Sequence, residues 1–230
     1  MNNNIEDSVR KTKKPWPTRE AMAQVYDLNL WGGNTGEFYS GEGSHHPGLV
    51  TPYLDAVISF LSSFTNPISI CDLGCGDFNV GKELLLYTRD YIAVDIVPNL
   101  IAYHQKRYTR DHLEFYCLNI AKDTLPPARC AILRQVLQHL SNSEIQQIVP
   151  KLAHYQYVLL TEHLPKGDFI ANKDIISGQG TRLKKNSGVD LLVPPFSFQA
   201  VAVKELLSID LDTISSGSKG KIVTVLYRMF

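Results

Sequence analysis

The feature that most constrains the fold is a regular alternation of short apolar runs with helical patterns over residues 68–161. Apolar runs typical of strands occupy 68–73, 91–95, 113–118, 131–133 and 157–160. Helical spacing of apolar residues marks 49–61, 80–87, 98–107 and 141–152, and the last of these starts with a Ser-x-x-Glu capping box. Strands that alternate with helices form a largely parallel sheet covered on both faces. We therefore expect a doubly wound, Rossmann-like α/β fold.

The C-terminal third has a different pattern. Residues 165–198 are rich in Gly, Lys, Asn and Pro and show no period, and a loop of this length is usually functional or disordered. Two extended runs follow at 201–209 and 221–229, joined by a turn-rich segment at 215–220. They predict an antiparallel hairpin that completes a seven-stranded sheet. At 230 residues, we expect one main domain at 49–230. Residues 1–48 would hold a tail, a helix and a possible covering loop.

Charge and composition exclude several classes of protein. Lys plus Arg and Asp plus Glu both total 23, so the chain lacks the positive field that attracts nucleic acid. We interpret the basic run at 10–14 as a solvated tail. No apolar run approaches the roughly 18 residues that span a bilayer, so we expect no membrane partner and a soluble, cytoplasmic protein. The four cysteines lie in or beside predicted strands without a Cys-x-x-Cys pair, which predicts reduced thiols.

The glycine turn at 71–83, CDLGCGDFNVGKE, could hold a phosphate, a dinucleotide or a cationic ligand. Residues 76–82 fit the Gly-x4-Gly-Lys part of a P-loop, but Glu83 stands where a Ser or Thr should coordinate magnesium. The dinucleotide fingerprint fits less well, because its third glycine arrives late, at Gly81. Asp72, at the end of the first strand, would also repel a pyrophosphate. The phosphate interpretation stays open as an alternative.

A ligand that carries both an ammonium group and a ribose would account for an acid at the end of each of the first two strands, Asp72 and Asp95. Asp95 ends the second strand 19 residues after Gly76, where a carboxylate can accept both ribose hydroxyls. The strand followed by Asp72-Leu73-Gly74-Cys75-Gly76 resembles the first motif of class I S-adenosylmethionine-dependent methyltransferases, acid-x-Gly-x-Gly. The resemblance covers residues 68–162 by motifs. It implies S-adenosyl-L-methionine as the cofactor and a methyltransferase domain at 49–230.

The resemblance also implies roles for individual residues. Asp72 would contact the methionine amino group, Gly74 and Gly76 would allow close packing against the cofactor, and Asp95 would bind the ribose. Ile96 would lie against the adenine. Asn119 stands where the family often has an adenine-binding Asp, with Ile120 beside it. Residues 134–140 look like the Arg-x-x-Leu-x-His-Leu run of many small-molecule members, so Arg134 and Gln135 are expected to line the methyl-donor site.

Methyl transfer from a sulfonium mainly requires alignment and exclusion of water, and an acceptor alcohol also needs a base. His139 is the candidate base, with a histidine fixed at a helix start as the alternative interpretation; the pairs His45-His46 and Glu162-His163 are weaker candidates. The glycine-rich stretch 31–46 could cover the cofactor or simply connect elements.

We expect a small-molecule acceptor, methylated at oxygen rather than nitrogen, because the polar-Pro-Pro-aromatic motif of amide and nucleobase methyltransferases does not follow the fourth strand. The similar letters at 193–196 lie in the long loop, where they could wall an acceptor pocket or turn the chain. No metal is expected. A P-loop nucleotide-binding protein and a non-catalytic S-adenosylmethionine-binding interaction domain remain alternatives. The sequence predicts no oligomeric state.

Overall fold

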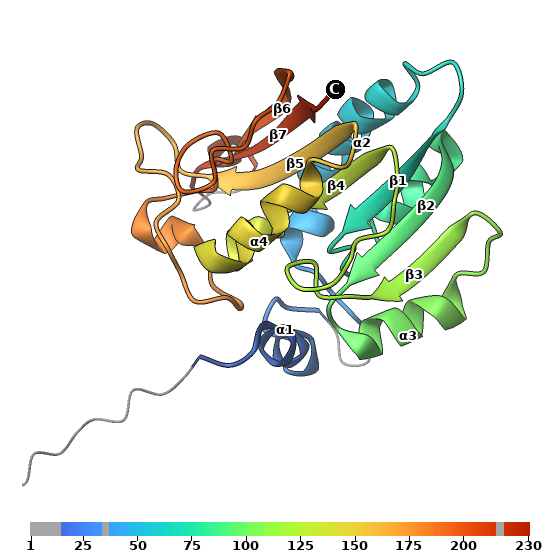
Figure 1. Cartoon of the computed structure of the whole chain (residues 1–230). Helices are drawn as coiled ribbons and strands as arrows, with labels where there is room; N and C mark the ends of the chain where they lie inside the picture. The colour runs from blue at the N-terminus through green and yellow to red at the C-terminus, as the bar shows by residue number, and fades with distance from the viewer. Residues whose placement is uncertain (1–14, 34–36, 215–218) are drawn as a thin grey trace, which may run out of the picture.

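A computed structural model describes residues 15–33, 37–214 and 219–230 of the chain (Figure 1). The basic run at 10–14, residues 34–36 of the glycine-rich stretch and the centre of the predicted hairpin turn at 215–218 lie outside the described residues. The described chain forms a seven-stranded sheet in the order β3-β2-β1-β4-β5-β7-β6. Its strands are β1 (Ile68–Leu73), β2 (Thr88–Asp95), β3 (Leu113–Cys117), β4 (Cys130–Arg134), β5 (Tyr157–Leu164), β6 (Ala202–Asp210) and β7 (Lys221–Arg228).

The strand directions confirm the predicted fold class. β1 to β5 pair in parallel, whereas β7 runs antiparallel to both β5 and β6. The chain moves outward from β1 through β2 to β3 and then returns to pair β4 with the other side of β1. Ligands of open parallel sheets bind where the order reverses, beyond the carboxyl ends of the strands. This topology therefore directs attention to the ends of β1 and β4.

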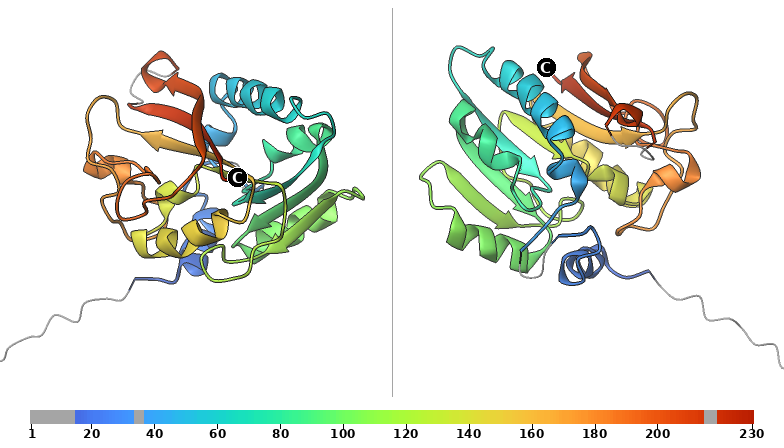
Figure 2. Two further views of the ribbon diagram at one scale, coloured as in Figure 1. Left: turned by 45° about the horizontal axis from the view of Figure 1, so that its top comes forward. Right: turned by 180° about the vertical axis from the view of Figure 1, so that it is seen from behind.

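Helices cover both faces of the sheet. One face packs against α2 (Pro47–Leu61), the 3₁₀ helix η2 (Gly81–Tyr87) and α3 (Pro98–Arg107), and the other against α4 (Asn142–Leu152) and residues of the long loop at 165–198. Figure 2 shows α2 lying across the sheet when the molecule is viewed from behind. Because both faces are covered, all six residues of β1 are buried, which is why parallel strands are apolar throughout.

The first helix lies outside these two layers. α1 (Thr18–Asp27) sits beyond the carboxyl ends of β1, β2 and β3 (Figure 1), where Tyr26 packs with Val97 and Leu100. The structure therefore places an N-terminal element at the edge of the sheet where ligands of this fold bind.

Three local features differ from the sequence-based expectations. The segment predicted as a helix at 80–87 is a 3₁₀ helix that begins at Gly81, and β2 already begins at Thr88. A Cβ on Gly81 would lie 2.6 Å from the ring of Phe78, so the chain is tightly packed here. Ser141 caps α4 as expected, but Glu144 does not complete the capping box, because the Ser141 N–H donates to Ser177 Oγ.

The long loop is folded against the sheet through a buried arginine. Arg182, in the 3₁₀ helix η4 (Arg182–Lys185), is 1% exposed and donates hydrogen bonds to the carbonyl oxygens of Leu137, Leu140 and Lys173. Two of those carbonyl groups, of Leu137 and Leu140, lie just before α4, so Arg182 ties the loop to the start of that helix. None of the helices among the described residues is long and apolar enough to cross a membrane.

Candidate functional site

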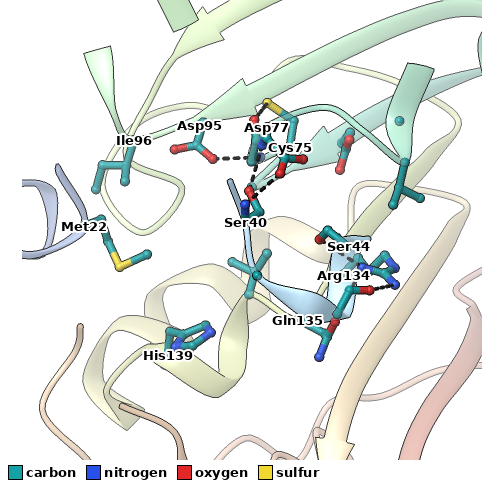
Figure 3. A pocket seen from close by; sticks show the side chains of 18 of the residues that line it. Met22, Ser40, Ser44, Cys75, Asp77, Asp95, Ile96, Arg134, Gln135 and His139 are labelled. Atoms are coloured by element: carbon teal, nitrogen blue, oxygen red, sulfur yellow. Dashed lines mark hydrogen bonds between the residues drawn. The ribbon is translucent and has the colours of Figure 1, made fainter. Parts of the chain in front are cut away.

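A cavity of about 480 Å³ lies at the carboxyl ends of the central strands. It is lined by all ten residues that the sequence indicated: Asp72, Gly74, Gly76, Asp95, Ile96, Asn119, Ile120, Arg134, Gln135 and His139. In Figure 3, Asp95 and Cys75 lie on one side of it, Arg134 and Gln135 on another, and His139 across from Asp95, with Met22 beside Ile96. Residues from five separate stretches of sequence therefore share one site.

The glycine turn after β1 is shaped by contacts with the protein itself. Gly74 and Gly76 have positive φ angles of 95° and 55°, which favour glycine. A Cβ on Gly74 would lie 2.4 Å from Val136, and one on Gly76 would lie 2.5 Å from Ser40 Oγ. Both glycines thus allow other segments of the chain to approach the turn closely.

Asp95 is buried and positioned by backbone groups. Its Oδ2 accepts a hydrogen bond from the Gly76 N–H at 3.1 Å, and its Oδ1 accepts one from the Val97 N–H at 3.1 Å. Burial raises the pKa of this carboxyl group, and the backbone donors oppose that rise. Each carboxylate oxygen has further acceptor capacity, so Asp95 can bind two hydroxyl groups while it remains fixed in place.

Asp72 has fewer hydrogen-bond partners. It is 6% exposed, and its Oδ2 accepts a hydrogen bond from the Tyr91 hydroxyl at 2.8 Å. Burial raises its pKa to about 7. A cation bound beside Asp72 would offset the cost of burying its charge, so this acid is suited to a positively charged ligand group.

Ile96, Asn119 and Ile120 form the part of the cavity near the ends of β2 and β3. The side-chain Oδ1 of Asn119 accepts hydrogen bonds from the N–H groups of Ala121 and Lys122 at 3.0 and 3.3 Å. Because these two bonds occupy the oxygen, the amide NH₂ is the group through which Asn119 can pair with a ligand. The two isoleucines offer apolar surface for a flat ring.

Arg134 and Gln135 end β4 and reach the N-terminal segment. The Arg134 guanidinium donates to the Gly43 carbonyl and lies 3.3 Å from Ser44 Oγ, while its Cζ is 4.7 Å from the centre of the Tyr53 ring. Gln135 has a φ of 57°, an unusual conformation for a residue with a side chain, and such strain is concentrated at functional sites.

His139, the candidate base, is half-buried in the cavity wall. Its ring centre is 5.2 Å from that of Trp31, and its Nδ1 is 3.3 Å from the Gly180 carbonyl oxygen. Burial lowers its pKa to about 4, so the imidazole is neutral at pH 7 but only weakly basic. Its role as a base therefore stays a prediction.

The other candidate bases do not line the cavity. His46 caps α2 by accepting a hydrogen bond from the Gly48 N–H, and His163 Nε2 contacts the Lys219 carbonyl at 2.8 Å. Glu162 is 3% exposed and accepts a hydrogen bond from the Leu137 N–H. His45 instead contacts Asp77, with 2.6 Å between Nε2 and Oδ2. These four residues thus have structural contacts of their own.

The second wall of the cavity comes from the N-terminal segment, in which the sequence indicated only the glycine-rich stretch 31–46 as a possible cover. Its lining residues include Met22, Tyr26, Trp31 and residues 40–44. Asp77 binds this segment to the glycine turn: its Oδ2 accepts from the Ser40 N–H at 2.6 Å, and its own N–H donates to Ser40 Oγ at 2.8 Å.

Two other sequence motifs lie away from the cavity. The 193–196 segment does not line it. Asn172 instead donates to the carbonyl oxygens of Val193 and Pro194, and Phe196 packs in the core, so the segment turns the chain. Lys82, the P-loop lysine candidate, is also absent from the lining and donates to Asn79 Oδ1 at 2.8 Å. Its position disfavours a P-loop, where the lysine must reach the phosphates.

Among the described residues, no group of three or more His, Cys, Asp or Glu side chains is placed to hold a metal ion.

Solved structures with the same fold are methyltransferases. The chain is similar to the N-methyltransferase NodS from Bradyrhizobium japonicum WM9 in complex with S-adenosyl-L-homocysteine, with a TM-score of 0.60, 11% identity, and coverage of 89% of this chain and 98% of that chain. It is also similar to magnesium protoporphyrin IX methyltransferase (ChlM) from Synechocystis PCC 6803 with bound SAM, with a TM-score of 0.58, 14% identity, and coverage of 94% and 100%. The methyltransferase domain of bacterial CtHen1-C matches with a TM-score of 0.52, 15% identity, and coverage of 78% and 98%.

No family model matches the sequence, and no curated protein matches it. At these identities the structural matches show the fold, which is that of class I S-adenosylmethionine-dependent methyltransferases. The resemblance inferred from the glycine turn is therefore confirmed for the fold.

Proposed function

We propose that the protein is an S-adenosylmethionine-dependent methyltransferase with a small-molecule acceptor. The observation that carries this proposal is the pair of buried acids, Asp72 and Asp95, which end neighbouring strands and line one cavity on either side of the glycine turn. An ammonium group and a ribose are the ligand groups that such acids bind.

The residues present fit this cofactor. Asp95 would accept the ribose hydroxyls, Asp72 would face the methionine ammonium group, and Ile96 and Ile120 would enclose the adenine, with the Asn119 amide as a donor at its edge. A volume of about 480 Å³ lies within the range of small-molecule pockets. Once bound, the cofactor supplies an activated methyl group on a sulfonium. The protein's contribution is to orient the reactants and exclude water, which the N-terminal wall and the sheet wall do together.

For the acceptor, we propose a hydroxyl group rather than an amine. Trp31, Gln135 and His139 line the cavity near the N-terminal wall and are the groups available to position it. The neutral imidazole of His139 can accept the hydroxyl proton, and its low pKa limits it to an acceptor activated by other groups. The balanced charge of the chain argues against a nucleic-acid substrate. Four free cysteines suit the reducing cytoplasm, where we propose that the protein acts.

A methyl-transfer assay tests this function. The protein is incubated with S-adenosylmethionine labelled in the methyl group and with a panel of small alcohols, phenols and amines. We expect label in at least one hydroxyl-bearing acceptor, and none with the Asp95→Ala variant. Tight cofactor binding without transfer to any acceptor would instead favour the non-catalytic binding protein, and label confined to amines would contradict the proposed acceptor atom.

A further inference from the structure

The long loop that follows β5 reaches the cavity at His139. The Gly178 N–H donates a hydrogen bond to the His139 carbonyl oxygen at 3.0 Å, and the Gly180 carbonyl oxygen lies 3.3 Å from Nδ1 of the His139 ring. Gln179, between the two glycines, donates from its side chain to the Leu30 carbonyl oxygen at 2.9 Å. The loop is therefore tied both to the candidate base and to the N-terminal wall of the cavity.

The other ring nitrogen of His139 faces the side chain of Gln138. Nε2 of the ring lies 3.2 Å from the amide nitrogen of Gln138, and the amide oxygen accepts a hydrogen bond from the His163 N–H at 3.2 Å. Because a backbone N–H can only donate, the oxygen is the end of the amide that faces His163, and the NH₂ is the end that faces the ring. Gln138 is 6% exposed, so the surrounding protein holds its amide in this orientation.

These contacts assign the proton on the imidazole of His139. A carbonyl oxygen only accepts and an amide NH₂ only donates, so Nδ1 carries the proton and Nε2 holds the lone pair. An imidazolium would instead direct an Nε2–H against the NH₂ of Gln138, and two donors that face each other repel. Gln138 therefore opposes protonation of the ring as well as fixing its tautomer.

The other groups around His139 also keep the ring neutral. Burial is the main cause that lowers its pKa to about 4, the positive charge of Arg182 adds to the lowering, and backbone groups of residues 178–180 oppose it. Trp31, on the N-terminal wall, contributes an uncharged ring whose centre is 5.2 Å from that of the imidazole. A neutral ring with its lone pair at Nε2 is thus the state that these surroundings stabilise.

We propose that Gln138 is a positioning residue for methyl transfer: together with the Gly180 carbonyl, it holds His139 in the tautomer whose proton-accepting nitrogen is Nε2. The inference rests on the proposed function, in which His139 accepts the proton of the acceptor hydroxyl. In that step the acceptor O–H replaces the NH₂ of Gln138 as the donor to Nε2. The O–H bond breaks, the proton bonds to Nε2, and the electron pair stays on the acceptor oxygen for its attack on the methyl group.

Nitrogen-15 NMR of the histidine side chains tests the inference without any acceptor. The chemical shifts of the two ring nitrogens report which of them carries the proton, and the signals of His139 are identified among the seven histidines by their loss in His139→Gln. We expect a protonated Nδ1 and an unprotonated Nε2 in the wild-type protein at pH 7. A proton on Nε2 at this pH would overturn the inference, and this result does not depend on the folding of any variant at Gln138.

Gln138→Glu replaces the donor that faces Nε2 with an acceptor of similar size. The new carboxylate would stabilise an Nε2–H and should raise the pKa of His139 by about 2, to about 6. The matched control is Gln147→Glu, an exposed position on α4, which adds the same charge elsewhere and should leave the titration of His139 unchanged. If His139 titrates in Gln138→Glu as it does in the wild type, Gln138 does not act on the ring and the inference is overturned.

The methyl-transfer assay links the tautomer to the reaction. At saturating S-adenosylmethionine, the ratio of the Gln138→Glu rate to the wild-type rate should fall about fourfold from pH 7.5 to pH 5.5, because His139 gains a proton in the variant alone. A ratio that is equal at both pH values indicates a merely structural role and would overturn the inference while leaving the proposed function intact. Absence of transfer by the wild-type protein would overturn the proposed function, and with it the role of Gln138, even with the expected tautomer.

Discussion

The two walls of the cavity are built by different means. The sheet wall consists of residues at the ends of β1, β2 and β4, such as Asp72 and Asp95, whose positions follow from strand register. The N-terminal wall consists of residues 40–44 and parts of α1, and side-chain contacts to Asp77 hold it in place. The comparison shows that the sheet supplies only part of the lining of the cavity. The remaining part comes from a segment that precedes the sheet in sequence.

The largest expected effect concerns the sheet wall. Asp95→Ala removes the proposed acceptor of both ribose hydroxyls, and the loss of two charge-assisted hydrogen bonds should weaken S-adenosylhomocysteine binding by about 100-fold. Calorimetric titration measures this change. Asp90→Ala, a half-exposed acid in the same strand whose carboxylate pairs with Arg89, serves as the control and should bind normally. An affinity within threefold of wild type in Asp95→Ala would show that this wall does not hold the ribose.

The next effect concerns the N-terminal wall. Asp77→Ala removes the acceptor for Ser40 and His45 and should weaken cofactor binding by about tenfold, because the segment no longer stays on the glycine turn. The matched control is Glu83→Ala, which removes an exposed carboxylate six residues away. If Asp77→Ala and Glu83→Ala bind the cofactor equally well, the contacts of Asp77 with the N-terminal wall contribute nothing to affinity.

The pH dependence of binding tests the sheet wall alone. Asp72, with its pKa raised to about 7, is mostly protonated at pH 6 and loses the charge that attracts an ammonium group. Affinity should therefore rise with pH, by about eightfold between pH 6 and 7.5 if the bound carboxyl stays ionised. His139, with a pKa of about 4, does not titrate in this range. Asp72→Asn should bind the cofactor weakly and without this pH dependence. If the variant keeps the wild-type pH dependence, a group other than Asp72 is responsible for it.

The smallest expected effect is a difference in stability between alanine substitutions at two glycines with positive φ. Gly76 and Gly167 have φ angles of 55° and 73°, so alanine strains both positions, but only at Gly76 would the new Cβ meet another atom, Ser40 Oγ at 2.5 Å. In urea unfolding, Gly76→Ala should cost about 1 kcal/mol more stability than Gly167→Ala. Equal losses would mean that the N-terminal wall moves away from the turn at little cost.

The sequence predicted the sheet wall because its signals are local. The ends of short apolar runs fix where parallel strands stop, and Asp72, Asp95 and Arg134 stand at those ends. The parallel pairing of the first five strands followed from the alternation of elements, and the antiparallel pairing of the two last strands from the turn-rich segment between them.

The N-terminal wall had a less specific signal, the glycine-rich stretch 31–46, which fits a covering loop and a plain connection equally well. The contact between Ser40 and Asp77 joins residues 37 positions apart through two hydrogen bonds, and no periodicity in the sequence indicates such a contact. The same holds for Arg182, whose side chain reaches Leu137 across 45 positions. The 3₁₀ conformation of η2 was also missed, because its apolar spacing resembles that of an α-helix and the difference arises from packing of Gly81 on Phe78.

The central claim is that the cavity binds S-adenosylmethionine, and direct calorimetric titration tests it. The wild-type protein is titrated with S-adenosylmethionine, S-adenosylhomocysteine, and ATP with magnesium in the same buffer. The account predicts micromolar binding of the two sulfur compounds at one site per chain, lost in Asp95→Ala, and no binding of ATP. Binding of ATP alone would contradict it and would show that Lys82, rather than Asp72, defines the ligand of the glycine turn.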